Sequence, residues 1–310
     1  MRVRVLAVLV LAAAALLARP AMAQSKLKVE KLADGVWAAT PEKGANVGWF
    51  LLGDGVVAVD SGGDVAAGAE ILKAIAETTG GKPVRALVLT HEHADHSGGA
   101  RAFAAAGARI VCQEAVAGPL FTFLTQGSDA KAPTASRPVL EAVSERSILF
   151  DGVHNVQIYF LGAAHTKGDL VVYLATDKIL FSGDLITNGR LPYMQSTDVD
   201  PMGWERALLA LSQVGVEKIV PGHGDIGPKS GLNESLAYLH AVNGLVKKFI
   251  TSGTADAALD AAIRSPENEI KGVPVTDGHV ANVKAAVKAE REKASRKAAS
   301  PTPAPTPAPK

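Results

Sequence analysis

The sequence has a single cysteine, no excess of charge of either sign and no long apolar run beyond its first residues. Cys112 has no second cysteine to pair with, and its context, RIVCQ, is typical of an inert thiol in a buried strand. The formal net charge is +1, with basic and acidic residues spread along the chain. This balance provides no electrostatic footprint for nucleic acid, so we expect a small-molecule substrate as the partner. The oligomeric state is left open.

The most apolar segment lies at the N-terminus, where Arg2 and Arg4 precede the run Val5–Ala18 and the residues AMA follow at 21–23. A basic start, a short apolar run and an A-x-A site are typical of a secretory signal peptide. The run is too short to span the ~30 Å hydrocarbon core of a bilayer comfortably, which argues against a membrane anchor. We therefore predict a signal peptide at 1–23, a periplasmic or secreted protein, and no membrane insertion after cleavage.

After this segment, strand-like runs followed by helical segments occur in the same order twice. The first half predicts strands at 27–32, 35–40, 46–52, 56–60, 84–90 and 109–112, and helices at 65–79, 98–106 and 114–125. The second half predicts strands at 147–150, 156–161, 170–175, 178–182 and 218–222, and helices at 201–213 and 232–251. Two sheets packed face to face, with helices outside, would bury this pattern in four layers. The predicted fold class is therefore an α/β, four-layer αββα sandwich.

The stretch THEHADHSGG gathers three of the eight histidines directly after a predicted buried strand. His91 and His93 are two residues apart, so in an extended segment both rings point the same way and reach one point. Asp95 and His96 follow where the chain turns, so their side chains face a second point beside the first. Imidazole nitrogens and carboxylate oxygens suit zinc and similar borderline ions. The stretch therefore predicts a metal site.

Three further residues of ligand type also stand at the ends of predicted strands. They are His165 in GAAHTKGDL, Asp184 in FSGDLI and His223 in VPGHG. Each follows an apolar run and a small residue, and α/β folds place their binding residues at such strand ends. We therefore expect these three side chains to join the cluster that begins at residue 91.

In this order, the motifs THEHADHSGG, AAHTKGD, LFSGDLI and VPGHG resemble those of the metallo-β-lactamase-fold hydrolases over residues 27–250. The resemblance implies a four-layer sandwich with a dinuclear metal site at one edge. It assigns His91, His93 and His165 to the first metal ion. It assigns Asp95, His96 and His223 to the second, with Asp184 bridging both.

The metals implied are two zinc ions per chain, with iron or manganese as alternatives. Two such ions would lower the pKa of a water molecule between them, so that hydroxide is present at neutral pH and attacks a carbonyl group. Asp95 is the predicted catalytic residue, because it is expected to orient that nucleophile as well as bind metal. Asp60, in VVAVDSGG, matches an acidic motif that holds the ligand loops by hydrogen bonds. No G-x-S-x-G motif is present, so no serine nucleophile of that type is expected.

Asp184 also separates the branches of the family. Dedicated β-lactamases usually carry cysteine or serine at this position, whereas thioesterase- and lactonase-like members carry aspartate. The chain resembles exported bacterial members, closer to the glyoxalase II-like and quinoprotein-associated hydrolases than to dedicated β-lactamases, although HTKGD departs from the glyoxalase II pattern HTPGH. The predicted function is exported, dinuclear zinc-dependent hydrolysis of an ester, thioester, lactone or lactam-type substrate.

Three alternatives stay open beside this function. The first is β-lactamase activity, since the same HxHxDH start occurs in some β-lactamases. The second is a mononuclear iron oxygenase of the persulfide dioxygenase type, which shares the fold and some of the ligands. The third is a non-catalytic, metal-binding carrier protein. Metal content and turnover by variants of the ligand residues distinguish the three.

The predicted domain organisation follows from these assignments. The signal peptide is followed by a metallo-β-lactamase-fold catalytic domain at 24–252 and a C-terminal helical extension at 253–298. The Pro-rich residues 299–310 are expected to be a disordered tail, and 126–138 a surface loop, because neither segment has hydrophobic periodicity.

Some polar residues outside the ligand set have weaker signals. Residues 187–198 follow the predicted bridging aspartate and are expected to line the cleft. Three side chains of this segment are candidates for substrate contacts: Asn188, Arg190 and Tyr193. Packing within the loop is an equal alternative for them. Three histidines match no motif and are excluded from the site: His154, His240 and His279. Of these, His240 lies in a predicted helix and is expected to make an interhelical contact.

Overall fold

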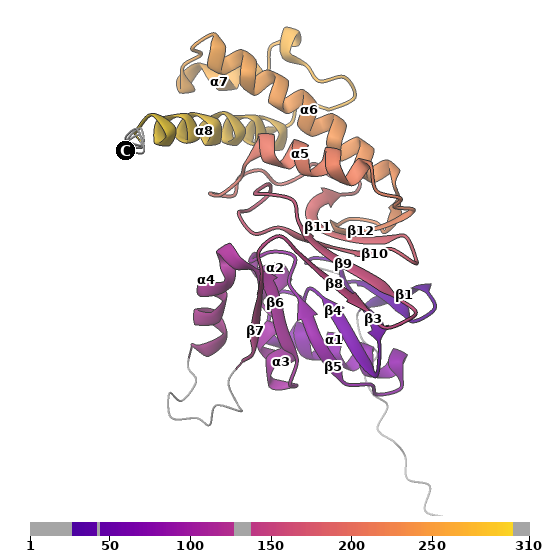
Figure 1. Cartoon of the computed structure of the whole chain (residues 1–310). Coiled ribbons are helices and arrows are strands. Elements are labelled where there is room, and N and C mark those ends of the chain that lie inside the picture. The colour runs from indigo at the N-terminus through magenta and orange to yellow at the C-terminus, as the bar shows by residue number, and fades with distance from the viewer. Residues whose placement is uncertain (1–26, 42–43, 127–137, 300–310) are drawn as a thin grey trace, which may run out of the picture.

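The computed structural model describes residues 27–41, 44–126 and 138–299. Two sheets lie in the middle of the molecule, and helices cover the outer side of each (Figure 1). The predicted signal peptide, the middle of the predicted loop at 126–138 and residues 300–310 of the predicted tail lie outside the described residues.

The first sheet begins as an antiparallel meander and continues with parallel strands. Its strands, in spatial as well as chain order, are β1 (Lys28–Ala33), β2 (Val36–Thr40), β3 (Val47–Leu52), β4 (Gly55–Val59), β5 (Val84–Val88), β6 (Arg109–Gln113) and β7 (Leu140–Val143). Pairing is antiparallel from β1 to β4 and parallel from β4 to β7. The parallel strands are connected through α1 (Val65–Thr79), α2 (Ala94–Ser97), α3 (Ala100–Ala105) and α4 (Glu114–Thr125).

The second sheet has the strand order β13-β12-β11-β10-β9-β8. Its strands are β8 (Arg146–Phe150), β9 (Asn155–Phe160), β10 (Leu170–Leu174), β11 (Ile179–Thr187), β12 (Lys218–His223) and β13 (Gly227–Pro228). Only β11 and β12 pair in parallel, because α5 (Pro201–Ser212) connects them. The chain then continues through α6 (Ser230–Thr251), α7 (Asp256–Ile263), η2 (Pro266–Asn268) and α8 (Asp277–Ala299).

Helix α1 shows how the local sequence sets the ends of an element. The Asp64 carboxylate accepts a hydrogen bond from the Ala67 N–H, which satisfies a free donor of the first turn. Gly80 adopts a left-handed φ of 70° and ends the helix. The helix therefore spans the residues predicted, 65–79.

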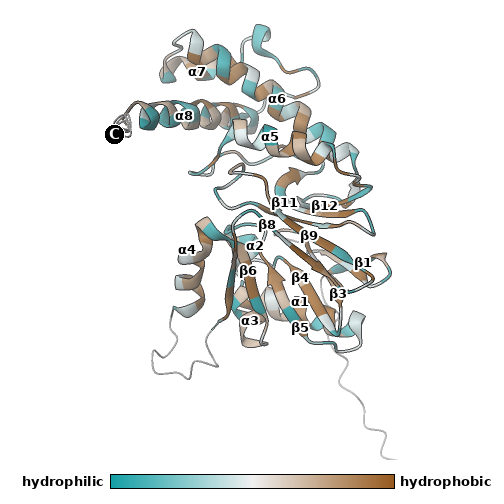
Figure 2. Cartoon of the chain, in the orientation of Figure 1, coloured by the Kyte–Doolittle hydropathy of each residue, from teal (hydrophilic) through white to brown (hydrophobic). Residues whose placement is uncertain are grey.

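Three clusters of buried hydrophobic side chains lie between the layers. Figure 2 shows hydrophobic residues along the strands of both sheets. The cluster between the sheets includes Phe50 and Phe181, whose ring centroids are 6.4 Å apart. A second cluster, which includes Phe103, lies between the first sheet and its helices. A third, which includes Trp204 and Val283, lies between the second sheet and helices α5, α6 and α8. Three apolar interfaces define four layers, so the predicted αββα sandwich is confirmed.

Some predicted boundaries were wrong. Strand β11 was expected at 178–182 but continues to Thr187, so Asp184 lies inside a buried strand and not in a turn after it. Its pairing with β12 shifts register around Gly183, and this glycine next to an acid masked the strand in the sequence. The helix predicted at 98–106 corresponds to α3 (Ala100–Ala105), and the short helix α2 that precedes it was not predicted. Strand β7 was not predicted.

The single thiol behaves as predicted. Cys112 lies in β6 and is buried, and burial raises the pKa of its thiol to about 11. A thiol that stays protonated at neutral pH is a poor nucleophile, so the prediction of an inert core residue is confirmed.

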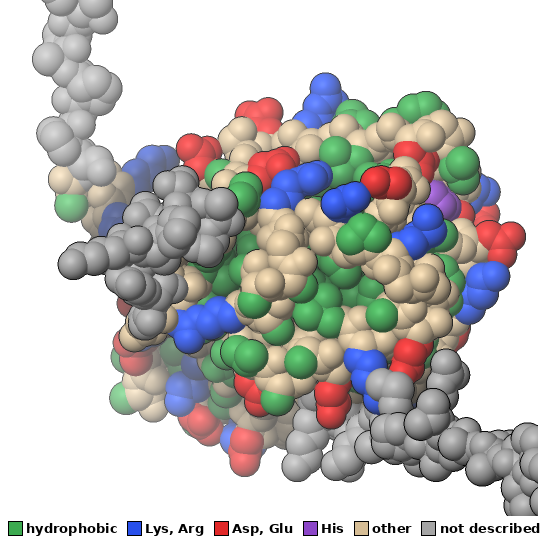
Figure 3. Space-filling model, turned by 90° about the horizontal axis from the view of Figure 1, so that it is seen from below, with side chains coloured by type: hydrophobic (Ala, Val, Ile, Leu, Met, Phe, Trp, Pro, Cys, Tyr) green, Lys and Arg blue, Asp and Glu red, His purple; other side chains and the backbone are tan. Residues whose placement is uncertain are grey.

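The surface carries charges of both signs. Figure 3 shows lysines and arginines intermixed with acidic residues around the face seen from below, with hydrophobic side chains nearer its centre. Within the described ranges, none of the helices combines the length and hydrophobicity needed to cross a bilayer. The intermixed charges on this face accord with the mixed charge pattern of the sequence.

The break between α2 and α3 lies where two loops approach at backbone distance. A Cβ atom at Gly99 would lie 2.0 Å from the Ser61 carbonyl oxygen, and one at Gly98 would lie 2.0 Å from that of Gly63. Ser61 donates to the carbonyl oxygen of His96 from its N–H at 2.7 Å and from its hydroxyl at 2.8 Å. Only glycine permits this approach, which packs the segment at 91–99 against the end of β4.

Replacing Gly99 with alanine should destabilise the protein by about 1–3 kcal/mol, because the added methyl group overpacks against backbone atoms. The matched control is Gly244→Ala in α6, where no atom would lie within 4 Å of the new Cβ. There the gain in helix propensity should stabilise the protein by about 0.5–1 kcal/mol. Thermal unfolding followed by circular dichroism measures both changes, and equal shifts for the two variants would contradict the prediction.

Candidate metal centre

The seven predicted ligand residues lie together at one edge of the sandwich. The segment after β5, including α2, carries His91, His93, Asp95 and His96, whereas the β9–β10 loop carries His165, β11 carries Asp184 and the end of β12 carries His223. They form two groups: His91, His93, His165 and Asp184, and beside them Asp95, His96 and His223. Within each group the ligand atoms lie within 4.8 Å of one another. The fold thus brings together every residue of the set.

The first group is a close cluster of three rings. The Nδ1 atom of His93 lies 3.0 Å from the Nε2 atom of His165. The ring of His91 meets both of these rings edge-on, with centroid separations of 4.7 Å and 4.9 Å. One oxygen of Asp184, Oδ2, lies 3.5 Å from His165 Nε2. The nitrogen atoms and the carboxylate therefore converge on one point.

The second group shares Asp184 with the first. Its other oxygen, Oδ1, lies 3.2 Å from His96 Nε2 and 3.5 Å from His223 Nε2. Oδ2 of Asp95 lies 3.1 Å from His223 Nε2 and 4.0 Å from His96 Nε2. Each oxygen of Asp184 thus faces a different group, which is the arrangement that a bridging carboxylate needs.

Hydrogen bonds behind the rings fix which nitrogen faces the centre. The Tyr193 carbonyl oxygen can only accept, so His165 donates from Nδ1 across 3.0 Å and turns the Nε2 lone pair inward. His96 donates from Nδ1 to Asp60 Oδ2 at 2.7 Å. The Thr90 hydroxyl donates to the same carboxylate at 2.8 Å, so it accepts from His91 Nδ1 at 3.1 Å. The Nε2 atoms of His91, His96 and His165 are therefore turned toward the centre.

Asp60 makes the contacts expected from its motif. One oxygen accepts from the Thr90 N–H at 2.8 Å, and the other accepts from the Thr90 hydroxyl and the His96 ring. Its backbone has a φ of 60°, in the left-handed region that costs energy for a residue with a Cβ atom. The predicted hydrogen-bonding role of Asp60 is confirmed, and these bonds hold the strained conformation in place.

Three buried atoms of the centre have no hydrogen-bond partner among the described residues: His91 Nε2, His96 Nε2 and Asp184 Oδ1. His96 Nε2 and Asp184 Oδ1 are close but lie outside hydrogen-bonding geometry. Leaving buried polar atoms unpaired is costly, and such atoms call for an ion, a water molecule or a ligand. Divalent cations in the two groups would supply these partners, so the residues present fit a metal site.

Charge at the centre also favours a cation. Burial lowers the pKa of His91, and lowers that of His165 to about 4, so both rings are neutral as ligands must be. Burial also opposes the charged form of His96, but Asp60 and Asp184 outweigh it and raise its pKa to about 10. For Asp184, burial opposes ionisation, and the contact with His96 nevertheless holds its pKa well below the ordinary value. These carboxylates stabilise positive charge between them.

Gly222 makes room for the shared carboxylate. A Cβ atom at this position would lie 2.0 Å from Asp184 Oδ1, so no other residue could precede His223 without moving the aspartate. The glycine of the VPGHG motif is therefore required by the centre itself and not only by the turn after it.

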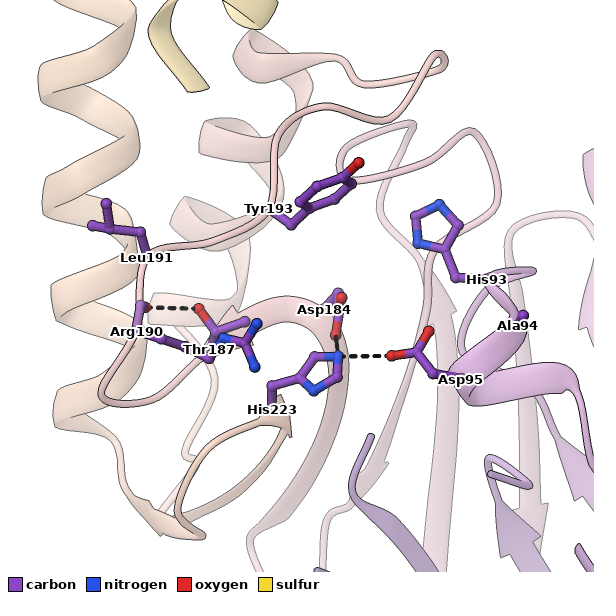
Figure 4. Close-up of a pocket in the computed structure, with 9 residues that line it drawn as sticks. All are labelled: His93, Ala94, Asp95, Asp184, Thr187, Arg190, Leu191, Tyr193 and His223. Carbon is purple, nitrogen blue, oxygen red and sulfur yellow. Dashed lines mark hydrogen bonds and ion pairs between the residues drawn. The ribbon is translucent and has the colours of Figure 1, made fainter. Parts of the chain in front are cut away.

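Both groups open onto one cavity of about 390 Å³ (Figure 4). Arg190 and Tyr193, two of the candidates for substrate contacts, line it from the segment after β11. The third candidate, Asn188, does not line it; its side-chain amide donates to the Asp225 carbonyl oxygen at 2.6 Å. Arg190 and Tyr193 therefore line the cleft, whereas Asn188 packs within the loop.

Two buried residues that support the centre were missed in the sequence. Asp169 accepts from the Thr166 N–H at 2.8 Å and from its hydroxyl at 2.9 Å, which closes the turn after His165. The signal for it was the T-x-x-D spacing inside HTKGD, because such residues commonly bond to each other across a turn. Burial raises the pKa of Asp169 to about 8.

The other missed residue, Asn282, lies in α8 and contacts the segment around Tyr193. Its amide nitrogen donates to the Pro192 carbonyl oxygen at 2.7 Å, and its amide oxygen accepts from the Met194 N–H at 3.2 Å. These bonds hold both neighbours of Tyr193, whose carbonyl oxygen accepts from His165. The only sequence signal was a polar residue on the apolar side of the last helix, next to Val283. Asn282 thus positions the backbone that orients a ligand.

The histidines outside the motifs lie in neither group. His240 Nδ1 lies 2.6 Å from Glu205 Oε1, so the predicted contact between helices, here α6 and α5, is confirmed. His154 pairs with Asp177 at 2.9 Å, and His279 contacts the Tyr238 hydroxyl at 3.2 Å.

The comparisons with known proteins agree with the fold and the centre. The family model of the metallo-beta-lactamase superfamily matches residues 41–223. Since this range covers more than half of the chain, the protein belongs to that superfamily. It is a metal-dependent hydrolase of the metallo-beta-lactamase fold.

Individual relatives point to more than one activity. The chain is 25% identical over 230 residues to a metallo-beta-lactamase type 2 of Elizabethkingia meningoseptica, which covers 68% of this chain and 84% of the relative. It is 34% identical over 154 residues to the acyl-coenzyme A thioesterase MBLAC2 of Bos taurus, covering 44% of this chain and 54% of that one. A solved metallo-beta-lactamase from Pontibacter korlensis superposes with a TM-score of 0.58 at 27% identity, over 69% of this chain and 99% of that chain.

Replacing Asn282 with alanine should weaken zinc binding about 10- to 100-fold, because the carbonyl oxygen that orients His165 loses its support. Competition with a chromophoric chelator measures the affinity. The matched control is Gln195→Ala, since Gln195 also donates to Asn282 Oδ1, at 2.8 Å, but holds neither neighbour of Tyr193. A variant at 282 that unfolds more easily yet binds zinc as tightly as the wild type would show a purely structural role.

Proposed function

We propose that the protein is an exported, dinuclear zinc-dependent hydrolase of esters and thioesters, with lactones and lactams as related substrates. The observation that carries this proposal is the position of Asp184 between the two groups, with one oxygen toward each. His91, His93 and His165 would hold one ion, and Asp95, His96 and His223 the other. Together the ions would supply hydroxide at neutral pH and polarise the bond to be broken.

The protein's own residues would orient the reactants. The hydrogen bond from His223 to Asp95 outweighs burial and lowers the pKa of this carboxylate. Asp95 is therefore ionised at neutral pH and available to accept a hydrogen bond from a water molecule in the cavity that it lines. Arg190 lines the same cavity on the side opposite Asp95 (Figure 4). Its guanidinium pairs with no carboxylate among the described residues. It is placed to hold an anionic part of a substrate.

Two observations bear on the choice of substrate. An aspartate at position 184 favours ester and thioester hydrolysis, and the thioesterase relative at 34% identity supports the same choice, although the chain spans about half of its length. Lactam hydrolysis is the second candidate, favoured by the broader match to the Elizabethkingia meningoseptica β-lactamase. Parallel assays with a thioester and with nitrocefin decide between them.

Replacing His93 with alanine should lower kcat/KM for ester or thioester hydrolysis by about 1,000-fold or more, because one ligand and the geometry of the first group are lost. The matched control is His240→Ala, a substitution at a side chain that is 80% exposed and lies outside both groups. Metal content is measured in the same samples by inductively coupled plasma mass spectrometry.

Three results would overturn the proposal in different ways. Activity that persists in a metal-free His93→Ala protein would remove the metal from the reaction. One iron per chain together with oxygen consumption would indicate the oxygenase. Full zinc binding without turnover of any acyl substrate would indicate a carrier.

Export is proposed on the sequence of residues 1–23 alone. Expressed with its own N-terminus in a Gram-negative bacterium, the protein should be recovered from the periplasm with Gln24 as its first residue. N-terminal sequencing makes the measurement. A cytoplasmic protein that still begins at Met1 would contradict the proposal.

A further inference from the structure

A second cavity, of about 580 Å³, adjoins the metal centre. We call it the annex cavity. It is formed by the segment after β11, by α6 and by residues 270–274, and its apolar walls include Leu191, Pro192, Ala237, Tyr238, Ile270 and Val273. A concave, mostly apolar space of this size is typical of small-molecule sites, which span about 300–1,000 Å³.

The annex cavity and the cavity of the metal centre share Thr187, Arg190 and Leu191. In Figure 4 the Leu191 side chain points toward the helix that passes beside this segment, on the side away from His93. A molecule whose reacting carbonyl lies at the metal centre would therefore meet the annex cavity once it passes Arg190. The annex cavity and the cavity of the metal centre could therefore serve as two parts of one elongated site.

Charged groups lie at the boundary of the annex cavity. Arg190 stands where the two cavities meet, and Lys271 and Glu234 also line the annex. No ion pair joins Arg190 or Lys271 to a carboxylate within the described parts of the chain. A chain with an apolar tail and a carboxylate or carbonyl head suits this distribution, because its tail contacts apolar walls while its head lies beside an unpaired cation.

The walls of the annex cavity come mainly from residues after the range that the family model matches. That range ends at residue 223, whereas α6 and the 270–274 segment follow it. The residues of the metal centre thus lie within the matched range, and most of the annex lining lies beyond it. Such a division is expected when the reaction is shared and the choice of substrate is not.

We propose that the annex cavity binds the apolar acyl chain of the substrate, so that the enzyme prefers medium-chain acyl esters or thioesters to acetyl ones. This inference rests on the proposed function. Water supplies the oxygen for the new acyl C–O bond, and the C–O or C–S bond to the leaving group breaks. One proton of the water goes to the leaving alcohol or thiol, and the other is released to solvent as the fatty acid product leaves as a carboxylate.

The zinc-loaded full chain is assayed with p-nitrophenyl acetate, butyrate and octanoate. For the wild type, kcat/KM should rise about threefold to fourfold for each methylene that enters the annex cavity. Ala237→Trp, which fills the cavity from α6, should lower kcat/KM for the octanoate about 10-fold or more and change the acetate less than about twofold. The matched control is Ala241→Trp, one turn further along the same helix and outside the annex lining, which should leave both values unchanged.

A binding measurement separates the annex cavity from the reaction. Isothermal titration with decanoate, and with acetate as the reference for the carboxylate alone, is done on metal-free and zinc-loaded protein. Decanoate should bind more tightly than acetate to both forms, and Ala237→Trp, but not Ala241→Trp, should weaken decanoate binding about 10-fold.

The outcomes distinguish the two proposals. Hydrolysis of acetate without any preference for chain length, together with decanoate binding that Ala237→Trp does not weaken, would overturn the annex proposal and leave the hydrolase intact. Failure to hydrolyse any ester or thioester would overturn the proposed function, whereas decanoate binding weakened by Ala237→Trp alone would still support the annex as a binding site.

Discussion

The contact on which the site depends is the one between the buried carboxylate of Asp60 and the segment after β5. Two bonds from Thr90 and one from His96 meet on this carboxylate, so a single side chain joins the end of β4 to the first ligands. The same bonds compensate for the left-handed backbone of Asp60 and select the tautomer of His96. Removing any of them would leave a buried charge with too few partners, which is costly. The glycines at 98 and 99 serve the same contact, because they let the two loops meet at backbone distance.

The centre gathers polar groups that only partly satisfy one another. His91 Nε2, His96 Nε2 and Asp184 Oδ1 are buried without a hydrogen-bond partner among the described residues. In the absence of a cation, this arrangement favours a proton on His96. Burial lowers the pKa of this ring, but the carboxylates of Asp60 and Asp184 outweigh burial and raise the pKa to about 10. A divalent ion replaces that proton and supplies the missing partner to several atoms at once. The rigidity of the surrounding strands keeps the groups in place, so the cost of gathering them is met during folding and not during catalysis.

The C-terminal helices take part in the site from two directions. Helix α8 holds the backbone on both sides of Tyr193 through Asn282, and that backbone orients His165. Helix α6 forms a wall of the annex cavity, and Tyr238 belongs both to that wall and to the hydrogen bonds around Asn282. The chain beyond residue 223 therefore connects ligand orientation with the space beside the metal centre. This connection has no counterpart in the motifs that identify the family.

The sequence by itself determined the four layers, because strand and helix periodicities occur twice in the same order and can be buried in only a few ways. It also indicated the candidate ligand set that the fold brings together, because each of these residues lies in a short motif next to an apolar run. It did not reveal that Asp184 lies within β11, since Gly183 interrupts the strand pattern and only pairing with β12 shows that the strand continues. Asn282 and the annex cavity were decided by the tertiary structure, whereas Asp169 had a local signal in the spacing from Thr166. Asn282 contacts Pro192, 90 residues away in the chain, and a contact between such distant segments leaves no local pattern in the sequence.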